Sequence, residues 1–261
     1  MIGLILGDTE FPKIIVERLV KKKIEFFIID LSKNNQFKKF KNSYQVSIGK
    51  FGLIIDIIKK NKSNKVLFAG KIYRPNLLKL RLDFKSILHM PNIIKASKIG
   101  DAAILKYIIK ILKEENIKVI SSNYFNPELT LKSGLYTKLR PNNDDLLSIK
   151  KGVNFLNKLN SLDHVQAVVV NKDNILAKEG RAGTKKMFSK ILDKSNGILI
   201  KFPKKQQDLR VDLPTVGLET LKDCKRFKIK GIVLKSKKNI FLNKNASIKY
   251  ANENKIFIKV I

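Results

Sequence analysis

Short apolar runs alternate with a segment of helical spacing over the first 31 residues, and this order constrains the fold most strongly. Ile2–Leu6 and Glu25–Leu31 have the length and apolar character of buried strands. Between them, a turn at 7–12 leads into Lys13–Lys23, where apolar residues recur every three or four positions. Strand, turn, helix and strand in this order predict the start of a parallel α/β sheet.

The same alternation continues to about residue 121 and then stops. Helices are predicted at Phe51–Lys60 and Ala102–Glu115, and strands at Val66–Ala69 and Val119–Ser121. The stretch 125–141 that follows is rich in loop signals, namely Pro127, Gly134 and Pro141. We therefore predict an α/β fold with an N-terminal Rossmann-like parallel-sheet domain over 1–131 and a C-terminal mixed α/β domain over 132–261.

The second domain has its own order of elements. The predicted helices lie at about 143–159, from Gly183–Thr184 to about 193, at 218–226 and at 246–252. The predicted strands lie at 165–170, 175–177, 198–202, 232–234, 240–242 and 256–261. Thr184 follows a glycine-broken turn, where a hydroxyl either caps the next helix or binds an anion.

Composition excludes several classes of protein. With 44% hydrophobic residues the chain can bury a core, so it is not a disordered protein. No apolar run approaches the roughly 20 residues of a membrane-spanning helix. The N-terminus lacks the basic start and cleavage site of a secretory signal, so we expect a cytoplasmic protein. The single cysteine, Cys224, excludes an internal disulfide and a cysteine-based zinc cluster.

The formal charge of +32 calls for an anionic partner, either nucleic acid, an anionic membrane surface or a phosphorylated substrate. No nucleic-acid-binding motif accompanies the charge, which is evenly spread and comes mainly from lysine. Only seven of the 54 basic residues are arginines. An arginine offers a planar fork for phosphate or carboxylate, and four lie in loop-like segments: Arg74, Arg140, Arg181 and Arg210. The alternative is that these arginines only cap or cross-link loops.

Two glycine turns follow predicted parallel strands. Gly7 begins one turn, which ends at Pro12, and Gly70 begins the other, which carries Lys71 and Arg74. Ligands of open α/β sheets gather at the carboxyl ends of strands, so the two turns are expected to share a crevice. The full G-x-G-x-x-G fingerprint of a dinucleotide-binding site is missing. Asp30, an acidic residue at the end of the second strand, is the one feature that supports the alternative of an NAD-dependent oxidoreductase.

The segment 201–217 is the strongest candidate for catalysis. It follows the apolar run Gly197 to Ile200 and contains Pro203 and Pro214 near its two ends. Each proline keeps the preceding residue out of the helical conformation, which predicts a loop and not a helix. Asp208 and Asp212 flank Arg210, a combination that suits a hydrated divalent metal and a phosphate ester. The alternative is a polar loop with surface ion pairs.

Taken in order, these motifs resemble the metal-dependent UDP-2,3-diacylglucosamine pyrophosphatases of lipid A synthesis, the family unrelated to calcineurin-like phosphoesterases. The likeness rests on short motifs spread over nearly the whole chain: Gly3-Leu4-Ile5 with Gly7 and Pro12, Ala69-Gly70-Lys71 with Arg74-Pro75, Gly100-Asp101 with Ala103-Ile104-Leu105, Gln166 to Val170, Gly183-Thr184, and Gln207 to Gly217. The last run is the longest and most specific. In relatives the Gly183-Thr184 motif usually has an acidic residue on each side, where this chain has Ala182 and Lys185.

The resemblance implies hydrolysis of the UDP-sugar pyrophosphate to UMP and 2,3-diacylglucosamine 1-phosphate. It implies a homodimer of two-domain subunits that hold the ligand between the domains and use Mg²⁺. A catalytic and metal-binding aspartate falls in the second domain of the family, so Asp208 and Asp212 are both candidates, with Arg210 beside them. The matched motifs predict these substrate contacts: Gly7, Pro12, Gly70, Lys71, Arg74, Asp101, Gly183, Thr184, Lys201 and Gln207.

The implied substrate carries two acyl chains and lies in a membrane. A strongly basic protein without a membrane span would then bind peripherally to the anionic cytoplasmic face of the inner membrane, where each surface cation adds about 1 kcal/mol. No histidine or cysteine nucleophile is well placed, which favours direct attack by water over a covalent intermediate. The alternative function is a non-catalytic protein that binds a nucleotide sugar or nucleic acid.

Overall fold

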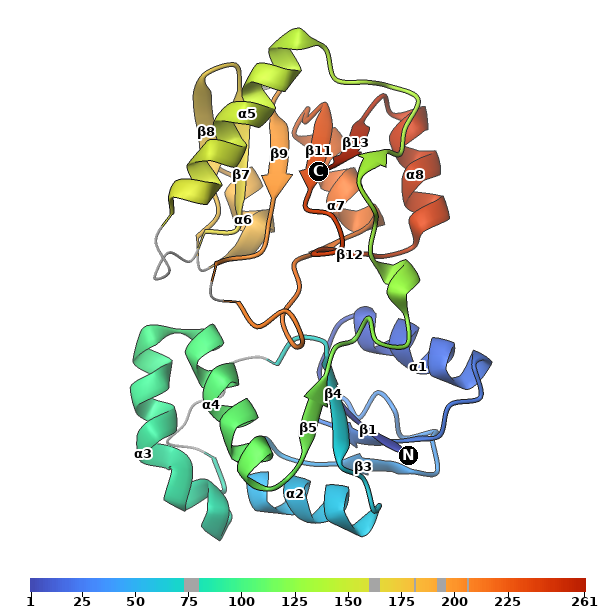
Figure 1. Ribbon diagram of the computed structural model, residues 1–261, viewed down its shortest axis with the longest axis vertical. Helices are drawn as coiled ribbons and strands as arrows, with labels where there is room; N and C mark the ends of the chain where they lie inside the picture. Colours follow the sequence, from blue (N-terminus) through green and yellow to red (C-terminus); the bar gives the residue numbers. More distant parts are fainter. Residues whose placement is uncertain (73–79, 160–164, 181, 192–195, 206) are drawn as a thin grey trace. The chain divides into compact units, whose positions relative to one another are not determined.

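A computed structural model describes residues 1–72, 80–159, 165–180, 182–191, 196–205 and 207–261. The chain forms two compact units (Figure 1). The first comprises Met1–Pro127 together with Arg210–Asp212, and the second comprises Glu128–Leu209 and Leu213–Ile261. Each unit combines helices with its own main sheet, so the predicted α/β class is confirmed.

The first unit is built on a parallel sheet of five strands in the order β3-β2-β1-β4-β5. This order confirms the Rossmann-like prediction, because the sheet grows outward from β1 in both directions. Its elements are β1 (Ile2–Leu6), α1 (Phe11–Lys21), β2 (Phe26–Asp30), β3 (Ser43–Gln45), α2 (Phe51–Lys60), β4 (Lys65–Ala69), α3 (Phe84–Ile99), α4 (Asp101–Glu114) and β5 (Lys118–Ile120).

Successive residues of each strand face opposite sides of this sheet, since side chains alternate along a strand. On one side Ile5, Ile29 and Val66 belong to a cluster that also contains Ile55 of α2 and Leu112 of α4. All five side chains are buried. Burial of one such side chain contributes roughly 1.5–3 kcal/mol, so this cluster is a main source of stability for the unit.

Two features of α3 and α4 differ from the prediction. The sequence did not predict α3, because Pro91 lies inside it and its apolar residues are not confined to one inward face. The helix predicted from Ala102 begins one residue earlier, because Gly100 is the N-cap of α4 and Asp101 is its first helical residue. Gly100 has φ of +148°, a conformation that favours glycine, and this geometry moves the start of the helix by one residue.

The second unit contains a sheet of six strands in the order β6-β13-β11-β9-β7-β8 and a parallel pair, β10 and β12. Strands β9, β11 and β13 are parallel to one another, whereas β7 is antiparallel to both β8 and β9. Its elements are η2 (Pro127–Leu129), β6 (Gly134–Leu135), α5 (Asn143–Lys158), β7 (Ala167–Asn171), β8 (Asn174–Lys178), α6 (Gly183–Phe188), β9 (Ile198–Lys201), β10 (Thr215–Val216), α7 (Leu218–Arg226), β11 (Gly231–Leu234), β12 (Ile240–Phe241), α8 (Lys244–Glu253) and β13 (Phe257–Val260).

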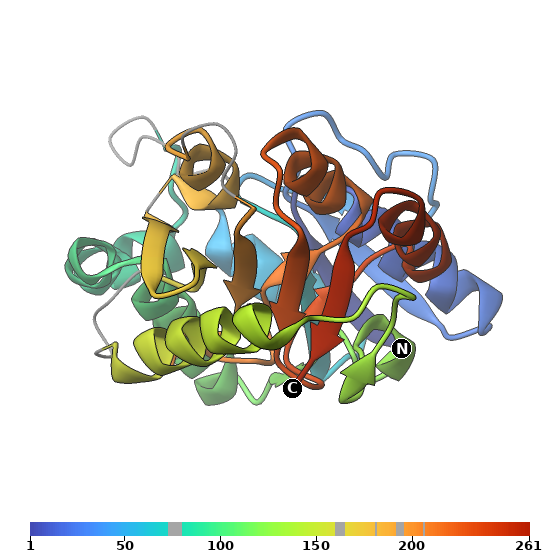
Figure 2. The same ribbon diagram turned by 90° about the horizontal axis from the view of Figure 1, so that it is seen from above.

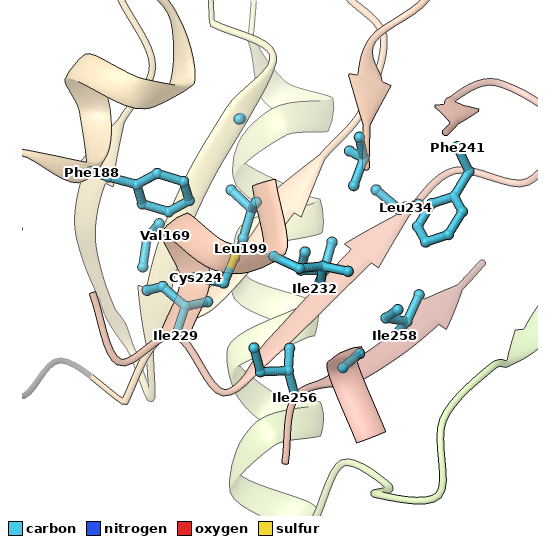
Figure 3. Close-up of a cluster of buried hydrophobic side chains, with 14 of the residues drawn as sticks. Val169, Phe188, Leu199, Cys224, Ile229, Ile232, Leu234, Phe241, Ile256 and Ile258 are labelled. Carbon is cyan, nitrogen blue, oxygen red and sulfur yellow. The ribbon is translucent and has the colours of Figure 1, made fainter. Parts of the chain in front are cut away.

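Helices cover both faces of the second sheet, as Figure 2 shows for α5 on one side and for α6, α7 and α8 on the other. Val168 and Val170 pack with Ile149 of α5, whereas Val169 faces the opposite cluster. That cluster includes Cys224 of α7, which lies among aliphatic side chains (Figure 3). Its burial raises the pKa of the thiol far above the ordinary value, so Cys224 is an inert core residue.

The helix predicted from Gly183 to about 193 is shorter in the structure. It ends at Phe188, with Ser189 as the C-cap. Met187 and Phe188 are buried in the core cluster, Ser189 and Lys190 are exposed, and Ile191 packs against the same cluster from outside the helix. The last two predicted positions, 192 and 193, lie outside the described residues.

We expect Gly231→Ala to destabilise the second unit. Gly231 lies opposite Phe257 in the register of β11 and β13, and a Cβ at this position would lie 2.1 Å from the ring. The ring is fully buried and has no free space, so the cost should be about 1–3 kcal/mol in urea unfolding.

Gly180→Ala is the matched control, because a Cβ there meets no atom within 4 Å. Its free energy of unfolding should stay within about 0.5 kcal/mol of that of the wild type. A Gly231→Ala protein as stable as the control would contradict the close packing of Phe257 over Gly231.

Candidate functional site

The two glycine turns of the first unit leave neighbouring strands, at the point where the strand order reverses. Strand β1 pairs with β2 on one side and with β4 on the other. Gly7 follows β1, and its backbone N–H donates to Ala69 at the end of β4 over 2.9 Å. Asp8 and Lys71 donate backbone hydrogen bonds to each other, both of 2.9 Å. The structure thus brings the two turns together at the switch point where open α/β sheets bind ligands.

Close packing of these turns explains both glycines. A Cβ on Gly7 would lie 2.6 Å from the carbonyl oxygen of Lys71. Gly70 has φ of +91°, and a Cβ there would lie 2.5 Å from Pro12 and 2.6 Å from the carbonyl oxygen of Asp8. Gly7, Pro12, Gly70 and Lys71 therefore form one cluster, in which the glycines allow the backbones to approach each other.

Asp30 does not serve as a ribose-binding acid in this structure. Its carboxylate is fully buried and accepts hydrogen bonds from the backbone N–H groups of Ser32 (2.8 Å) and Phe37 (3.1 Å). A buried carboxylate with two such donors holds the loop after β2 and offers nothing to a ribose hydroxyl. The weak oxidoreductase alternative loses its one supporting residue.

In the second unit, the ends of β8 and β9 lie on either side of the start of β7. The backbone N–H of Glu179, just after β8, donates to Ala167 over 2.8 Å. Ala167 lies opposite Lys201, the last residue of β9. The register of these three strands therefore places Glu179 and Lys201 at the same edge of the sheet.

Thr184 connects the two buried charges at this edge. Its hydroxyl donates to Oε1 of Glu179 (2.5 Å) and accepts from Nζ of Lys201 (2.8 Å). Glu179 and Lys201 are only 3% and 7% exposed. The shared hydroxyl satisfies one oxygen of Glu179 and one hydrogen-bond donor of Lys201 and restrains both side chains, whereas Oε2 of Glu179 is buried without a hydrogen-bond partner among the described residues.

This arrangement corrects one prediction and adds one residue. Thr184 does not cap α6, because Ala182 is the N-cap and no side chain caps this helix. Gly183, the residue before Thr184, has a φ of +83°, a backbone conformation that favours glycine. Glu179 was not predicted as a site residue, because its partners lie 5 and 22 positions away and only the sheet register joins them. A lone acid after a strand gives no sequence signal of this kind.

The loop after β9 is held by its own amide side chain. Gln207 is buried, and its side chain accepts from the backbone N–H of Lys204 over 2.9 Å. Its own N–H donates to the carbonyl oxygen of Lys204 over 3.1 Å. Asn239, a buried residue just before β12, donates to the carbonyl oxygen of Lys201 over 3.0 Å and so holds the start of the loop. Gln207 and Asn239 thus shape this loop.

The other predicted site residues are distributed over both units. Asp208 is half-buried and belongs to the second unit, whereas Arg210 and half-buried Asp212 belong to the first. Arg210 is exposed and lines a cavity of about 240 Å³ with Lys65, Lys118 and Tyr124. Asp101 is exposed at the first turn of α4, and Arg74 lies outside the described residues. Within the described part of the chain, no three His, Cys, Asp or Glu side chains are grouped to hold a metal.

Comparison with known proteins places this chain in a family. The model of the LpxI N-terminal domain matches residues 1–129, and the model of the LpxI C-terminal domain matches residues 132–259. The chain belongs to the LpxI family. The UDP-2,3-diacylglucosamine pyrophosphatase LpxI of Caulobacter vibrioides is 29% identical to it over 223 residues, which cover 82% of this chain and 80% of that protein.

Both clusters lie inside the matched LpxI domains. The turns at Gly7 and Gly70 fall in the N-terminal domain match, and the Glu179–Thr184–Lys201 cluster falls in the C-terminal one. The segment from Gln207 to Asp212 also lies in the C-terminal match. In this member of the LpxI family, each cluster lies where strands end at the edge of a sheet. The strands are the parallel neighbours β1 and β4 in the first unit, and β8 and β9 on either side of antiparallel β7 in the second.

We expect Thr184→Val to destabilise the second unit by roughly 1–3 kcal/mol, because it leaves two buried charges without their common partner. Valine has nearly the same shape as threonine, so the loss reports the hydroxyl and not the volume. Thr184→Ser keeps the hydroxyl and should recover most of the stability. Urea unfolding of the three proteins measures the difference, and equal stability of Thr184→Val and wild type would contradict the network.

Proposed function

We propose that this protein hydrolyses the pyrophosphate bond of UDP-2,3-diacylglucosamine, releasing UMP and 2,3-diacylglucosamine 1-phosphate in lipid A biosynthesis. The observation that carries the proposal is the match of both LpxI domains, in order, over 1–129 and 132–259. The relative from Caulobacter vibrioides is a UDP-2,3-diacylglucosamine pyrophosphatase, and its name supplies the reaction. The cations and carboxylates of the two units suit this chemistry.

Cleavage of a pyrophosphate requires neutralisation of charge on the bridging and non-bridging oxygens. In the second unit, we assign this task to the ammonium group of Lys201, which Thr184 holds in a fixed position at the sheet edge. Arg210 can grip two phosphate oxygens at once, because its guanidinium group is a planar fork. Lys71, with its backbone fixed by Asp8, is the corresponding cation of the first unit, and we keep Arg74 as a further candidate.

Asp208 and Asp212 are the candidate metal ligands, and one or both would act. Mg²⁺ is usually bound through one or two carboxylates and completes its shell with water and substrate phosphates, so Asp208 and Asp212 are a sufficient set of protein ligands for it. When bound, Mg²⁺ would neutralise phosphate charge and lower the pKa of a bound water. We do not assign metal ligation to Ala182 or Lys185, which have no carboxylate.

We propose water as the nucleophile. Cys224 is fully buried with a raised thiol pKa, and the ring of His89 pairs with the hydroxyl of Tyr107. His164 lies outside the described residues. Neither described side chain lies in the loops assigned to the site, which leaves the carboxylate of Asp208 or Asp212 to orient or deprotonate a water.

The location follows from the proposed substrate. No helix among the described residues is both long enough and apolar enough to cross a membrane. We propose a cytoplasmic protein that binds the anionic face of the inner membrane through its surplus of 32 positive charges and works as a homodimer. We propose no nucleic-acid partner.

Hydrolysis of UDP-2,3-diacylglucosamine by the purified protein tests the function. UMP should be released with Mg²⁺ and not with EDTA, whereas a protein that only binds nucleotide sugars releases none under either condition. Asp208→Asn or Asp212→Asn should lower the rate by about a hundredfold or more, since each removes a negative charge without changing side-chain shape.

Asp173→Asn is the matched control for these two variants. Asp173 is exposed in the turn between β7 and β8, and its substitution should leave the rate unchanged. If both Asp208→Asn and Asp212→Asn retain the full rate, the site assignment is wrong even where the reaction itself is observed.

A further inference from the structure

Helix α3 exposes an apolar face to solvent. Phe84, Ile87, Leu88 and Ile94 are 81%, 58%, 64% and 42% exposed. Together with exposed Pro91, they lie on one helix face, because 84, 88 and 91, and likewise 87, 91 and 94, are spaced three or four residues apart. Scattered apolar residues on a surface need no explanation, but a continuous stripe on one helix marks an interaction site.

The start of α3 is held firmly by polar groups on its inner side. The Asp83 carboxylate accepts from the N–H groups of Ser86 (2.9 Å) and Leu53 (3.1 Å). Burial alone would raise the pKa of Asp83, but these hydrogen bonds outweigh burial and lower it. The hydroxyl of Ser86 accepts from the N–H of Phe51 over 2.9 Å. These contacts attach α3 to α2, so the exposed stripe belongs to an anchored helix.

Further along, α3 again binds the protein through polar groups. His89 Nδ1 and Asn92 Nδ2 each lie 3.0 Å from the hydroxyl of Tyr107 in α4. Lys85 pairs with Glu115 over 2.5 Å. A surface helix normally buries its apolar face and exposes its polar one. Helix α3 does the reverse along much of its length, and Figures 1 and 2 both show it at the outer edge of its unit, beside α4.

We propose that the outer face of α3 binds the surface of an anionic lipid bilayer. Lys95 and Lys98 are exposed next to the apolar stripe, and residues 84–99 contain no acidic residue. Lys95 and Lys98 each lie four residues after a member of the stripe, Pro91 and Ile94, so they continue the same face toward the C-terminal end of α3. Apolar side chains followed by lysines on one face suit a helix that lies in the membrane interface. The lysine stems lie along apolar surface while their ammonium groups reach lipid phosphates.

Charge favours a bilayer over a second copy of this chain as the occupant. Two copies of α3 that met through this face would bring Lys95 and Lys98 of each copy together with no acidic residue of 84–99 to offset them, whereas anionic lipid attracts both lysines. The helix has 16 residues and is about 24 Å long, so it is suited to lying along a membrane and too short to span the ~30 Å core. The inference rests on the proposed function in one respect: a diacylated substrate gives the enzyme a reason to reach the membrane.

Vesicle binding of the full chain tests the surface. Wild type should sediment with vesicles of phosphatidylglycerol and phosphatidylethanolamine and less with phosphatidylcholine alone. Ile87→Ser with Leu88→Ser should weaken binding about tenfold or more, because two apolar side chains no longer enter the interface. Val20→Ser with Leu147→Ser removes exposed apolar residues from α1 and α5 and should change binding less than about twofold. Lys95→Gln with Lys98→Gln should reduce both affinity for anionic vesicles and its dependence on salt.

A fluorescence measurement covers the case in which a double variant folds poorly. The chain has no tryptophan, so Leu88→Trp introduces a single reporter on the face. Its emission should shift to shorter wavelength when anionic vesicles are added, while that of Leu147→Trp on α5 should not. Unchanged binding of Ile87→Ser with Leu88→Ser, or no shift at Leu88→Trp, would overturn the proposal.

Two further measurements distinguish a membrane-binding face from a subunit interface and from the catalytic site. If sedimentation velocity without lipid finds a dimer that Ile87→Ser with Leu88→Ser dissociates, the face is a subunit interface and the membrane proposal is wrong. UMP release from substrate in detergent micelles should be equal in the double variant and wild type. If wild type releases no UMP but binds vesicles through α3, the proposed function fails while this surface stands.

Discussion

Parallel pairing of buried strands is the constraint on which both units depend. Strands such as β1 and β4, or β9 and β11, are apolar and covered by helices, so they must run side by side and end at the same edge. The loops that leave this edge then converge, although they are distant in sequence. Gly7 meets Lys71 in this way, whereas Glu179 is placed at the same edge as Lys201 because β8 and β9 flank β7, which is antiparallel to both. The sheet edge thus supplies each unit with its cluster of polar groups.

The partners of a buried charged group determine whether the group is available to a ligand. Lys201 and Glu179 are almost fully buried, and Thr184 between them limits the motion of both. Such a network is costly if any member is lost, since a buried charge without a partner is strongly unfavourable. Asp30 shows the opposite use of burial, because its carboxylate is fully engaged by backbone N–H groups and only supports a loop. The hydrogen-bond partners of a buried charge, and not its burial, therefore separate candidate ligand contacts from residues that stabilise the fold.

Helix α3 connects the fold to the proposed substrate. Ser86 and His89 face α2 and α4, whereas Phe84, Ile87 and Leu88 face solvent. This inversion would destabilise an isolated soluble domain, because exposed apolar surface gains nothing from the hydrophobic effect until another apolar phase covers it. A lipid bilayer is such a phase, and it is where a diacylated sugar nucleotide resides. The surplus of positive charge adds attraction of longer range to an anionic surface.

The sequence by itself determined the α/β class, most helices and strands, and the motifs of the family, because these depend on local periodicity and on runs of specific residues. It also indicated that the turns at Gly7 and Gly70 meet, since parallel strands end together. It did not reveal α3, whose interior proline and outward apolar face disagree with the usual pattern. Nor did it reveal that Glu179 joins Thr184 and Lys201, or that Gly100 and not Asp101 caps α4. Only the tertiary structure decided these points, because strand register, backbone conformation and burial arise from contacts between segments far apart in the chain.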